Sequence, residues 1–156
     1  MVAGTERSFN MAVVDDVGQD TDADVDQGAG PIEVLVVDDD PDLADLVQEF
    51  LERADDALAV TTATNARTGL QLVRERSFDA VVSDYHMRTM DGLTFLDRVA
   101  DTDSAPPGIV FSSDDAPEIV EAARAAGVPY VQKRMRSERF DRLASRVRTV
   151  VEDRQN

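Results

Sequence analysis

Short apolar runs rich in β-branched residues alternate along this chain with longer segments whose apolar residues recur at helical spacing. The runs are too short to be buried helices, so each is interpreted as a buried strand. Strict alternation with short connections predicts parallel strands joined by right-handed crossovers, and five such units favour an open sheet over a closed barrel. We therefore expect a doubly wound, flavodoxin-like (βα)5 fold of the α/β class with strand order 2-1-3-4-5. The expected strands cover 32–37, 58–62, 80–82, 108–111 and 129–132, and the expected helices begin at 41, 65, 92, 117 and 138.

Acidic side chains follow two of these strands directly. Asp38 and Asp39 come after the first strand, and Asp84 comes after the third. The expected strand order makes these strands neighbours, so their carboxyl ends bring the three carboxylates to one edge of the sheet. Carboxylates packed this closely repel one another unless a hard cation lies between them, and Mg²⁺ is the expected ion. Asp40, next in sequence, is the expected N-cap of a helix opened by Pro41.

Two further polar side chains reach the same edge. Ser112 follows the fourth strand and Lys133 follows the fifth. Phosphoryl transfer onto a carboxylate needs positioning and charge neutralisation, which a metal ion, a hydroxyl group and an ammonium group supply. This constellation predicts Asp84 as a nucleophile that holds an aspartyl phosphate.

Over residues 32–151 the chain resembles the receiver domains of two-component response regulators, the CheY-like superfamily. The resemblance depends on motifs spread across the chain: Val37-Asp38-Asp39, Ser83-Asp84-Tyr85-His86-Met87, Met90-Asp91-Gly92, Ser112, and Tyr130 three residues before Lys133.

The resemblance implies a metal site and a phosphoacceptor. Asp84 would accept the phosphoryl group. Asp39 would bind Mg²⁺ directly, Asp38 would support the ion partly through water, and the backbone carbonyl of His86 would complete the protein ligands. His86 lies two residues after Asp84, and Asp114 lies two residues after Ser112. These positions predict that the two side chains flank the phosphoryl pocket on opposite sides.

The resemblance also implies a signalling switch and not an enzyme with an external substrate. Ser112 and Tyr130 would form the switch pair, with Lys133 contacting the phosphoryl group. The donor would be a histidine kinase. The output would reach a downstream protein partner through the surface formed by the helix at 117–126, the strand at 129–132 and the helix at 138–151.

Two positions depart from the family pattern. Arg88 and Arg134 stand where the family usually has proline. Because a non-proline cis bond costs about 2.5–4 kcal/mol, the Lys133–Arg134 bond is expected to be trans. The two arginines motivate an alternative, a receiver-like interaction module that is not phosphorylated.

A flavodoxin-like nucleotide or flavin protein is a third hypothesis. It shares the expected fold class. The acidic turn after the first strand disfavours this hypothesis, because its carboxylates would repel a ligand phosphate.

Composition restricts the partners. The formal net charge is −16, which disfavours binding to nucleic acid or anionic membranes. Without cysteine, without a long apolar run and without a signal-like amino terminus, the sequence predicts a cytoplasmic protein. Acid is mostly aspartate and Lys133 is the only lysine, a bias typical of halophilic organisms, so we expect a halophilic archaeal origin and salt-dependent folding.

Residues 1–30 are expected to be a disordered acidic extension that precedes a receiver domain at 31–154. They contain few large apolar residues, so they cannot offset the entropy cost of folding. Within them, Val13-Val14-Asp15-Asp16 repeats the sequence at 36–39 but lacks the helical pattern that follows the second copy. The first copy is therefore not expected to form the site.

Overall fold

The computed structural model describes residues 30–133 and 138–155. They form a parallel sheet with strand order β2-β1-β3-β4-β5, which confirms the doubly wound α/β fold. The extension at 1–29, with its Val13–Asp16 repeat, and the Lys133–Arg134 bond lie outside the described residues, so the expectations about them stay predictions. The strands are β1 (Ile32–Val37), β2 (Leu58–Ala63), β3 (Ala80–Ser83), β4 (Gly108–Ser112) and β5 (Tyr130–Gln132).

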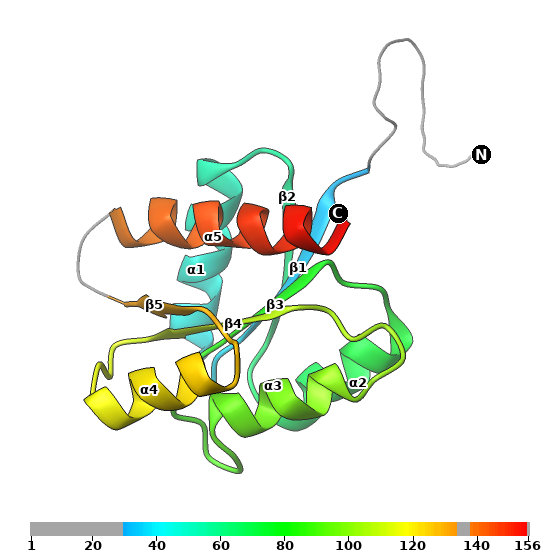
Figure 1. Cartoon of the computed structure of the whole chain (residues 1–156). Helices are drawn as coiled ribbons and strands as arrows, with labels where there is room; N and C mark the ends of the chain where they lie inside the picture. The colour runs from blue at the N-terminus through cyan, green and yellow to red at the C-terminus, as the bar shows by residue number, and fades with distance from the viewer. Residues whose placement is uncertain (1–29, 134–137, 156) are drawn as a thin grey trace, which may run out of the picture. The chain divides into compact units, whose positions relative to one another are not determined.

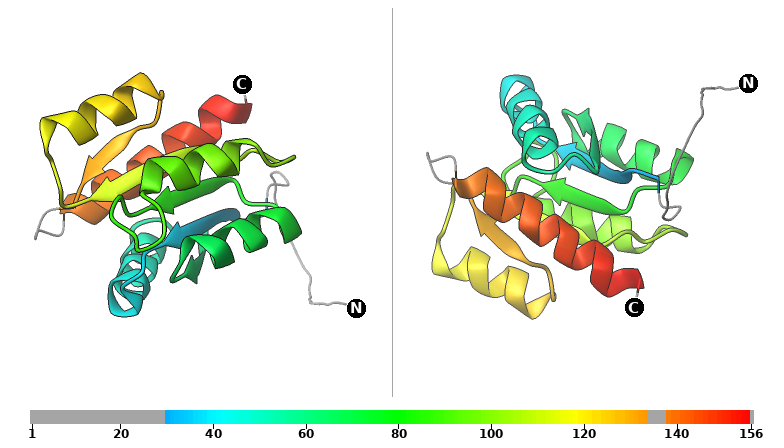
Figure 2. Two further views of the ribbon diagram at one scale, coloured as in Figure 1. Left: turned by 90° about the horizontal axis from the view of Figure 1, so that it is seen from below. Right: turned by 90° about the horizontal axis from the view of Figure 1, so that it is seen from above.

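Helices cover both faces of the sheet, with α1 and α5 on one face and α2, α3 and α4 on the other (Figure 1). The views along the sheet show the same two layers (Figure 2). Both faces of the central strands are therefore buried, which explains why their sequences are continuously apolar. The helices are α1 (Pro41–Ala54), α2 (Ala66–Glu75), α3 (Gly92–Ala100), α4 (Pro117–Ala125) and α5 (Glu138–Gln155).

Local side chains set where several helices begin and end. The side chain of Asp40 accepts hydrogen bonds from the first turn of α1, as expected, and Asn65 and Asp91 do the same for α2 and α3. Each cap satisfies backbone donors that have no partner within the helix. Gly127 follows α4 with a φ of 72°, the left-handed conformation in which glycine commonly ends a helix.

Each face of the sheet carries its own apolar core. Val34 and Val36 of β1 point towards α1 and α5, whereas Leu35 and Val37 point towards α2 and α3. This alternation follows from the period of two along a strand. β3 and β4 are each one residue longer than expected, so Ser83 and Ser112 are buried within the sheet.

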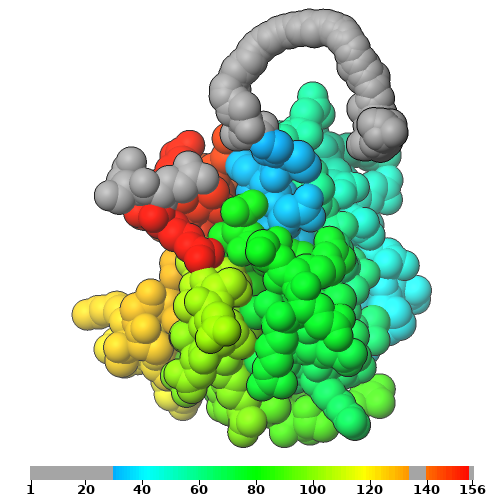
Figure 3. All heavy atoms as spheres, turned by 90° about the vertical axis from the view of Figure 1, so that its right-hand side faces the viewer, coloured from blue at the N-terminus to red at the C-terminus, as the bar shows by residue number. Residues whose placement is uncertain are grey.

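Two arginines attach α5 to distant parts of the domain. Arg154 donates a hydrogen bond to the backbone carbonyl of Ser104, and Figure 3 shows the end of α5 (red) beside the loop before β4 (yellow-green). Arg148 binds the Asp55 carboxylate, which ends α1, through Nε and through Nη2 at 3.3 Å from Oδ1. The hydrogen bond from Arg148 holds the pKa of Asp55 below its ordinary value of 3.8.

Asp55→Asn is expected to lower the free energy of unfolding at pH 7 by about 1 kcal/mol, because it removes a charge-assisted pair of which the carboxylate is largely buried. A carboxylate with a lowered pKa stabilises the fold above its unfolded pKa and loses this effect as pH falls through the folded value. The difference from wild type should therefore be constant above pH 5, roughly one unit above the ordinary pKa of Asp55, and shrink below pH 3.8. Urea unfolding across this range measures it. Glu49→Gln, which removes the exposed pair with Arg53, is the control and should change stability much less.

Salt is expected to stabilise the fold strongly. The chain carries 32 acidic residues against 16 basic ones. The Debye length falls from about 10 Å at 0.1 M salt to about 3 Å at 1 M, so KCl should screen this repulsion. The melting temperature, followed by circular dichroism, should rise over this range. A melting temperature independent of KCl would contradict the halophilic interpretation and leave the fold assignment intact.

Candidate functional site

Three carboxylates meet at the carboxyl edge of the sheet. β1 and β3 pair so that Val37 lies opposite Ser83, and the amide of Asp84 donates to the carbonyl of Val37 at 3.0 Å. One carboxylate oxygen from each of Asp38, Asp39 and Asp84 lies within 4.8 Å of the others. The structure thus brings together the three acids expected from the strand order. Oxygen ligands at this spacing suit a small hard cation.

Backbone hydrogen bonds orient two of these carboxylates. Asp38 is 4% exposed, and its Oδ1 accepts from the amide of Asp40 at 3.0 Å. Asp84 is partly buried, and its Oδ1 accepts from the amide of Tyr85 at 2.9 Å. The side chain of Asp40 caps α1 instead of joining the cluster, because the chain turns into the helix there.

Lys133 places a buried ammonium group against the cluster. Its amide donates to the carbonyl of Ser112 at 2.8 Å, which extends the pairing of β4 and β5 by one residue. Its Nζ lies 3.1 Å from Asp38 Oδ2 and 3.6 Å from Asp84 Oδ1, and 5.4 Å from the centre of the Phe111 ring. The side chain is only 9% exposed. A cation held in this way is costly to bury without its carboxylate partners, so Lys133 is part of the site and not a surface residue.

The environment of Asp84 opposes its charge. Burial raises the pKa of Asp84 above its ordinary value, the Lys133 ammonium opposes this rise, and the nearby Asp38 and Asp39 carboxylates add to it. A carboxylate with a raised pKa is more basic, and therefore a better nucleophile when ionised, than an exposed one.

The expected switch residues are joined through the loop after β4. Ser112 is 1% exposed, and its Oγ accepts from the amide of Asp114 at 3.2 Å. The hydroxyl of Tyr130 donates to the carbonyl of Ser112 at 3.3 Å and to the carbonyl of Asp114. A displacement of this loop would therefore change the contacts of both side chains.

His86 and Asp114 form a direct bridge between the loops that follow β3 and β4. His86 Nε2 lies 2.6 Å from Asp114 Oδ2, and this hydrogen bond lowers the pKa of Asp114. The sequence placed both residues beside the pocket, but contact between them depends on the positions of two separate loops. The predicted metal-binding role of the His86 carbonyl stays a prediction.

Gly92 is required where α3 begins, for a reason that the sequence did not reveal. Its amide donates to the carbonyl of Tyr85 at 2.7 Å. A Cβ atom at this position would lie 2.3 Å from the carbonyl oxygen of Asp84. The loop after Asp84 therefore returns so closely to α3 that no side chain fits.

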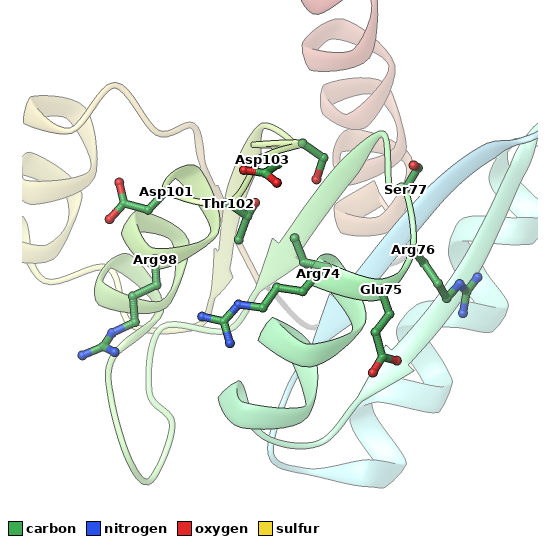
Figure 4. Close-up of a pocket in the computed structure, with 10 residues that line it drawn as sticks. Arg74, Glu75, Arg76, Ser77, Arg98, Asp101, Thr102 and Asp103 are labelled. Atoms are coloured by element: carbon green, nitrogen blue, oxygen red, sulfur yellow. The ribbon is translucent and has the colours of Figure 1, made fainter.

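Two surface hollows differ in their relation to the site. One, of about 440 Å³, lies at the ends of α2 and α3, on the opposite edge of the sheet. In Figure 4, Glu75 and Arg76 point away from Arg98. The other, of about 470 Å³, adjoins the site and includes Asp39 and Arg88 among its lining residues. Only the second places charged groups next to the carboxylate cluster.

Comparison with known families gives a match over most of the chain. The model of the response regulator receiver domain matches residues 34–145. A two-component response regulator of rice, ORR21, is 38% identical over 128 residues, which are 78% of this chain and 18% of the rice protein. The probable C4-dicarboxylate response regulator DctR of Priestia megaterium is 25% identical over 74% of this chain and 51% of its own length. The chain thus spans between about one fifth and one half of these relatives.

Solved structures show the same fold. The receiver domain of the Francisella response regulator 1452 aligns with a TM-score of 0.67 and 25% identity, over 78% of this chain and 97% of that one. A CheY-like receiver domain protein from Methanospirillum hungatei aligns with a TM-score of 0.69 and 20% identity, over 81% of this chain and 98% of that one. Both alignments cover nearly the whole of the solved domain.

Proposed function

Because this chain belongs to the receiver domain family of two-component response regulators, we propose that it is a signalling switch in which Asp84 accepts a phosphoryl group from a histidine kinase. The family supports phosphorylation-dependent signalling in general, and the residue, the donor and the metal ion are our proposal. The observation that carries it is the buried Lys133 ammonium against Asp38 and Asp84, beside a third carboxylate. A carboxylate proposed as nucleophile, an ammonium group and two further carboxylates suited to a hard cation thus lie close together.

In the proposed transfer, a carboxylate oxygen of Asp84 attacks phosphorus, and the P–N bond of a phosphohistidine breaks. The imidazole leaves with the electron pair of that bond. Lys133 neutralises part of the charge on the phosphoryl group from the side of Asp38, and Ser112 donates its hydroxyl hydrogen to a phosphoryl oxygen. The clustered carboxylates of Asp38, Asp39 and Asp84 fit Mg²⁺. In our proposal these three residues and the His86 carbonyl would hold the ion. When bound, Mg²⁺ would neutralise charge on the transferring group.

Phosphorylation would act on the loop after β4. Reorienting the Ser112 hydroxyl towards a phosphoryl oxygen removes the acceptor now used by the Asp114 amide. The same loop supplies the two carbonyls to which the Tyr130 hydroxyl donates, so a displacement of the loop would change the contacts of Tyr130 as well. A local change of charge then biases two arrangements of the surface formed by α4, β5 and α5, where we propose that the downstream protein partner binds.

The direct test is intact mass spectrometry after incubation with acetyl phosphate and Mg²⁺. We expect a mass gain of one phosphoryl group that EDTA prevents. No gain in wild type, with the fold verified by circular dichroism, would overturn the proposal and favour a receiver-like interaction module. That second candidate is favoured by one observation, the pairing of Arg88 with Asp39, which places a protein cation beside a proposed metal ligand.

Lys133→Arg is expected to remain phosphorylatable at Asp84 but to lose the structural response. Arginine keeps the positive charge but replaces a compact ammonium by a planar fork, which cannot occupy the same buried position between Asp38 and Asp84. Amide hydrogen exchange near Ser112 and Tyr130, with and without beryllofluoride, measures the response. Equal changes in the variant and in wild type would show that Lys133 does not transmit the signal.

The proposed environment is cytoplasmic, without contact to membranes or nucleic acid, and rests on the strongly acidic composition. Among the described residues, no helix has the length and apolar character needed to cross a bilayer.

A further inference from the structure

The carboxylate cluster has a second positively charged neighbour besides Lys133. Lys133 faces Asp38 and Asp84, whereas Arg88 places its Nε 3.9 Å from Asp39 Oδ2. The two cations thus approach different members of the cluster. Among the described residues, three carboxylates and two cations leave a net charge of about −1, so a bound divalent cation would make this group of charges positive before a phosphoryl group arrives.

Arg88 is free to change partners. Its side chain is 88% exposed, and the contact with Asp39 is an ion pair too long for a hydrogen bond. Arg88 and Asp39 both line the hollow of about 470 Å³ beside the cluster, so the guanidinium can move there without disturbing the core. Arg88 lies four residues after Asp84, in the loop between β3 and α3. Its backbone therefore stays next to the carboxylate cluster when the side chain moves.

We propose that Arg88 is a residue that binds the phosphodonor and has two successive partners: it pairs with Asp39 while the metal site is empty, and it binds the incoming phosphoryl group once a divalent cation takes Asp39. The inference rests on the proposed function. It assigns a role to a residue at which this chain departs from the family pattern. The Arg88 guanidinium competes with the metal ion for Asp39 and attracts the phosphodonor. Removal of Arg88 should therefore raise the affinity for Mg²⁺ and lower the affinity for the phosphodonor.

The experiment compares wild type with Arg88→Gln at the lowest KCl concentration at which circular dichroism shows a folded chain. Calorimetry without phosphodonor should give Mg²⁺ binding about two- to fivefold tighter in the variant, the size expected for loss of one exposed ionic contact. Labelling by acetyl phosphate at saturating Mg²⁺ should reach half of its maximal rate at an acetyl phosphate concentration about two- to fivefold higher, with the maximal labelling rate constant nearly unchanged. Both differences should fade at about 1 M KCl, where exposed charges are screened.

Two further variants control for charge and position. Arg88→Lys keeps the charge and should restore both affinities most of the way towards wild type. Arg53→Gln removes an exposed arginine, paired with Glu49 near the end of α1, and should change neither. A general loss of structure would weaken both affinities and could not produce opposite shifts.

Unchanged or weaker Mg²⁺ binding in Arg88→Gln, or equal shifts in Arg53→Gln, would overturn the proposal. A failure of the proposed phosphoacceptor function would give a different result from a failure of the Arg88 proposal. If wild type were not labelled at all, the phosphoacceptor role would be wrong, while the metal-binding comparison would still decide whether Arg88 competes for Asp39.

Discussion

Replacing Asp84 by asparagine is expected to abolish phosphorylation completely and at the same time to stabilise the metal-free fold. Asparagine has nearly the same shape but no nucleophilic carboxylate, so intact mass after incubation with acetyl phosphate and Mg²⁺ should show no gain. The affinity for Mg²⁺ should also fall, because one of three clustered carboxylates is removed. Asp97→Asn, an exposed change of the same charge on α3, should be labelled like wild type.

The gain in stability follows from the raised pKa of Asp84. A carboxyl group whose folded pKa exceeds its ordinary value of 3.8 favours the folded state when protonated, and this contribution is lost as pH rises through the folded pKa. Wild type therefore carries a penalty at neutral pH that the variant lacks. The melting temperature of Asp84→Asn minus that of wild type should increase from pH 4 to pH 7, a range that begins near the ordinary pKa of aspartate. Saturating Mg²⁺ should reduce the difference, since the ion stabilises wild type more.

An unchanged difference across this pH range would show that burial of Asp84 does not destabilise the fold. Labelling of the variant to the wild-type level would have a different meaning, because it would place the phosphoacceptor elsewhere. Peptide mapping of the labelled protein would then identify the residue.

Gly92→Ala is expected to lower stability and to disrupt the carboxylate cluster together. The added Cβ would lie 2.3 Å from the carbonyl oxygen of Asp84 and 3.0 Å from Cα of Tyr85, and both atoms belong to the backbone. Relief requires the loop or the start of α3 to shift, which costs about 1–3 kcal/mol and corresponds to a melting temperature roughly 2–12 °C lower. Because the loop begins at Asp84, the same shift should displace its carboxylate and weaken Mg²⁺ binding by about tenfold or more.

Substitutions at two other glycines test whether the effects of Gly92→Ala come from the close backbone contact and not from the loss of a glycine in general. Gly30→Ala meets no atom within 4 Å and should change neither quantity. Gly127→Ala forces a side chain into a left-handed conformation with φ of 72°, far from the site, so it should cost about 1 kcal/mol without affecting Mg²⁺ binding. Normal Mg²⁺ affinity in Gly92→Ala would show that the loop absorbs the Cβ atom without moving Asp84.

Much of the fold followed from local patterns. The apolar runs and helical spacings predicted all five strands and five helices, with the ends of most elements displaced by no more than one or two residues. The Asp40 cap was predictable because its effect depends on backbone groups only a few positions away. Strand order involves elements that are far apart in the sequence, and it was predicted from general rules for the connections and order of parallel strands.

The meeting of Asp38, Asp39 and Asp84 was also predictable, since residues that end neighbouring parallel strands lie at one edge. Lys133 reaches the same edge by the same rule. The side-chain contacts of these residues required the tertiary structure. The choice of Asp38 and Asp84 as partners of Lys133 depends on the register of β5, whose last residue, Gln132, lies opposite Ser112 and so places Lys133 one residue beyond the paired strands.

Contacts between side chains of segments far apart in the chain were decided by the tertiary structure alone. The His86–Asp114, Arg88–Asp39 and Asp55–Arg148 pairs each join segments whose own sequences contain no signal for the other. The requirement for Gly92 likewise arises from the carbonyl of Asp84, which only the folded loop brings against α3. Sequence periodicity and strand-end rules determine which elements form and at which edge polar residues gather, because these depend on local backbone geometry. Pairing between distant segments depends on the distances that packing leaves between them, and these distances exist only in the folded chain.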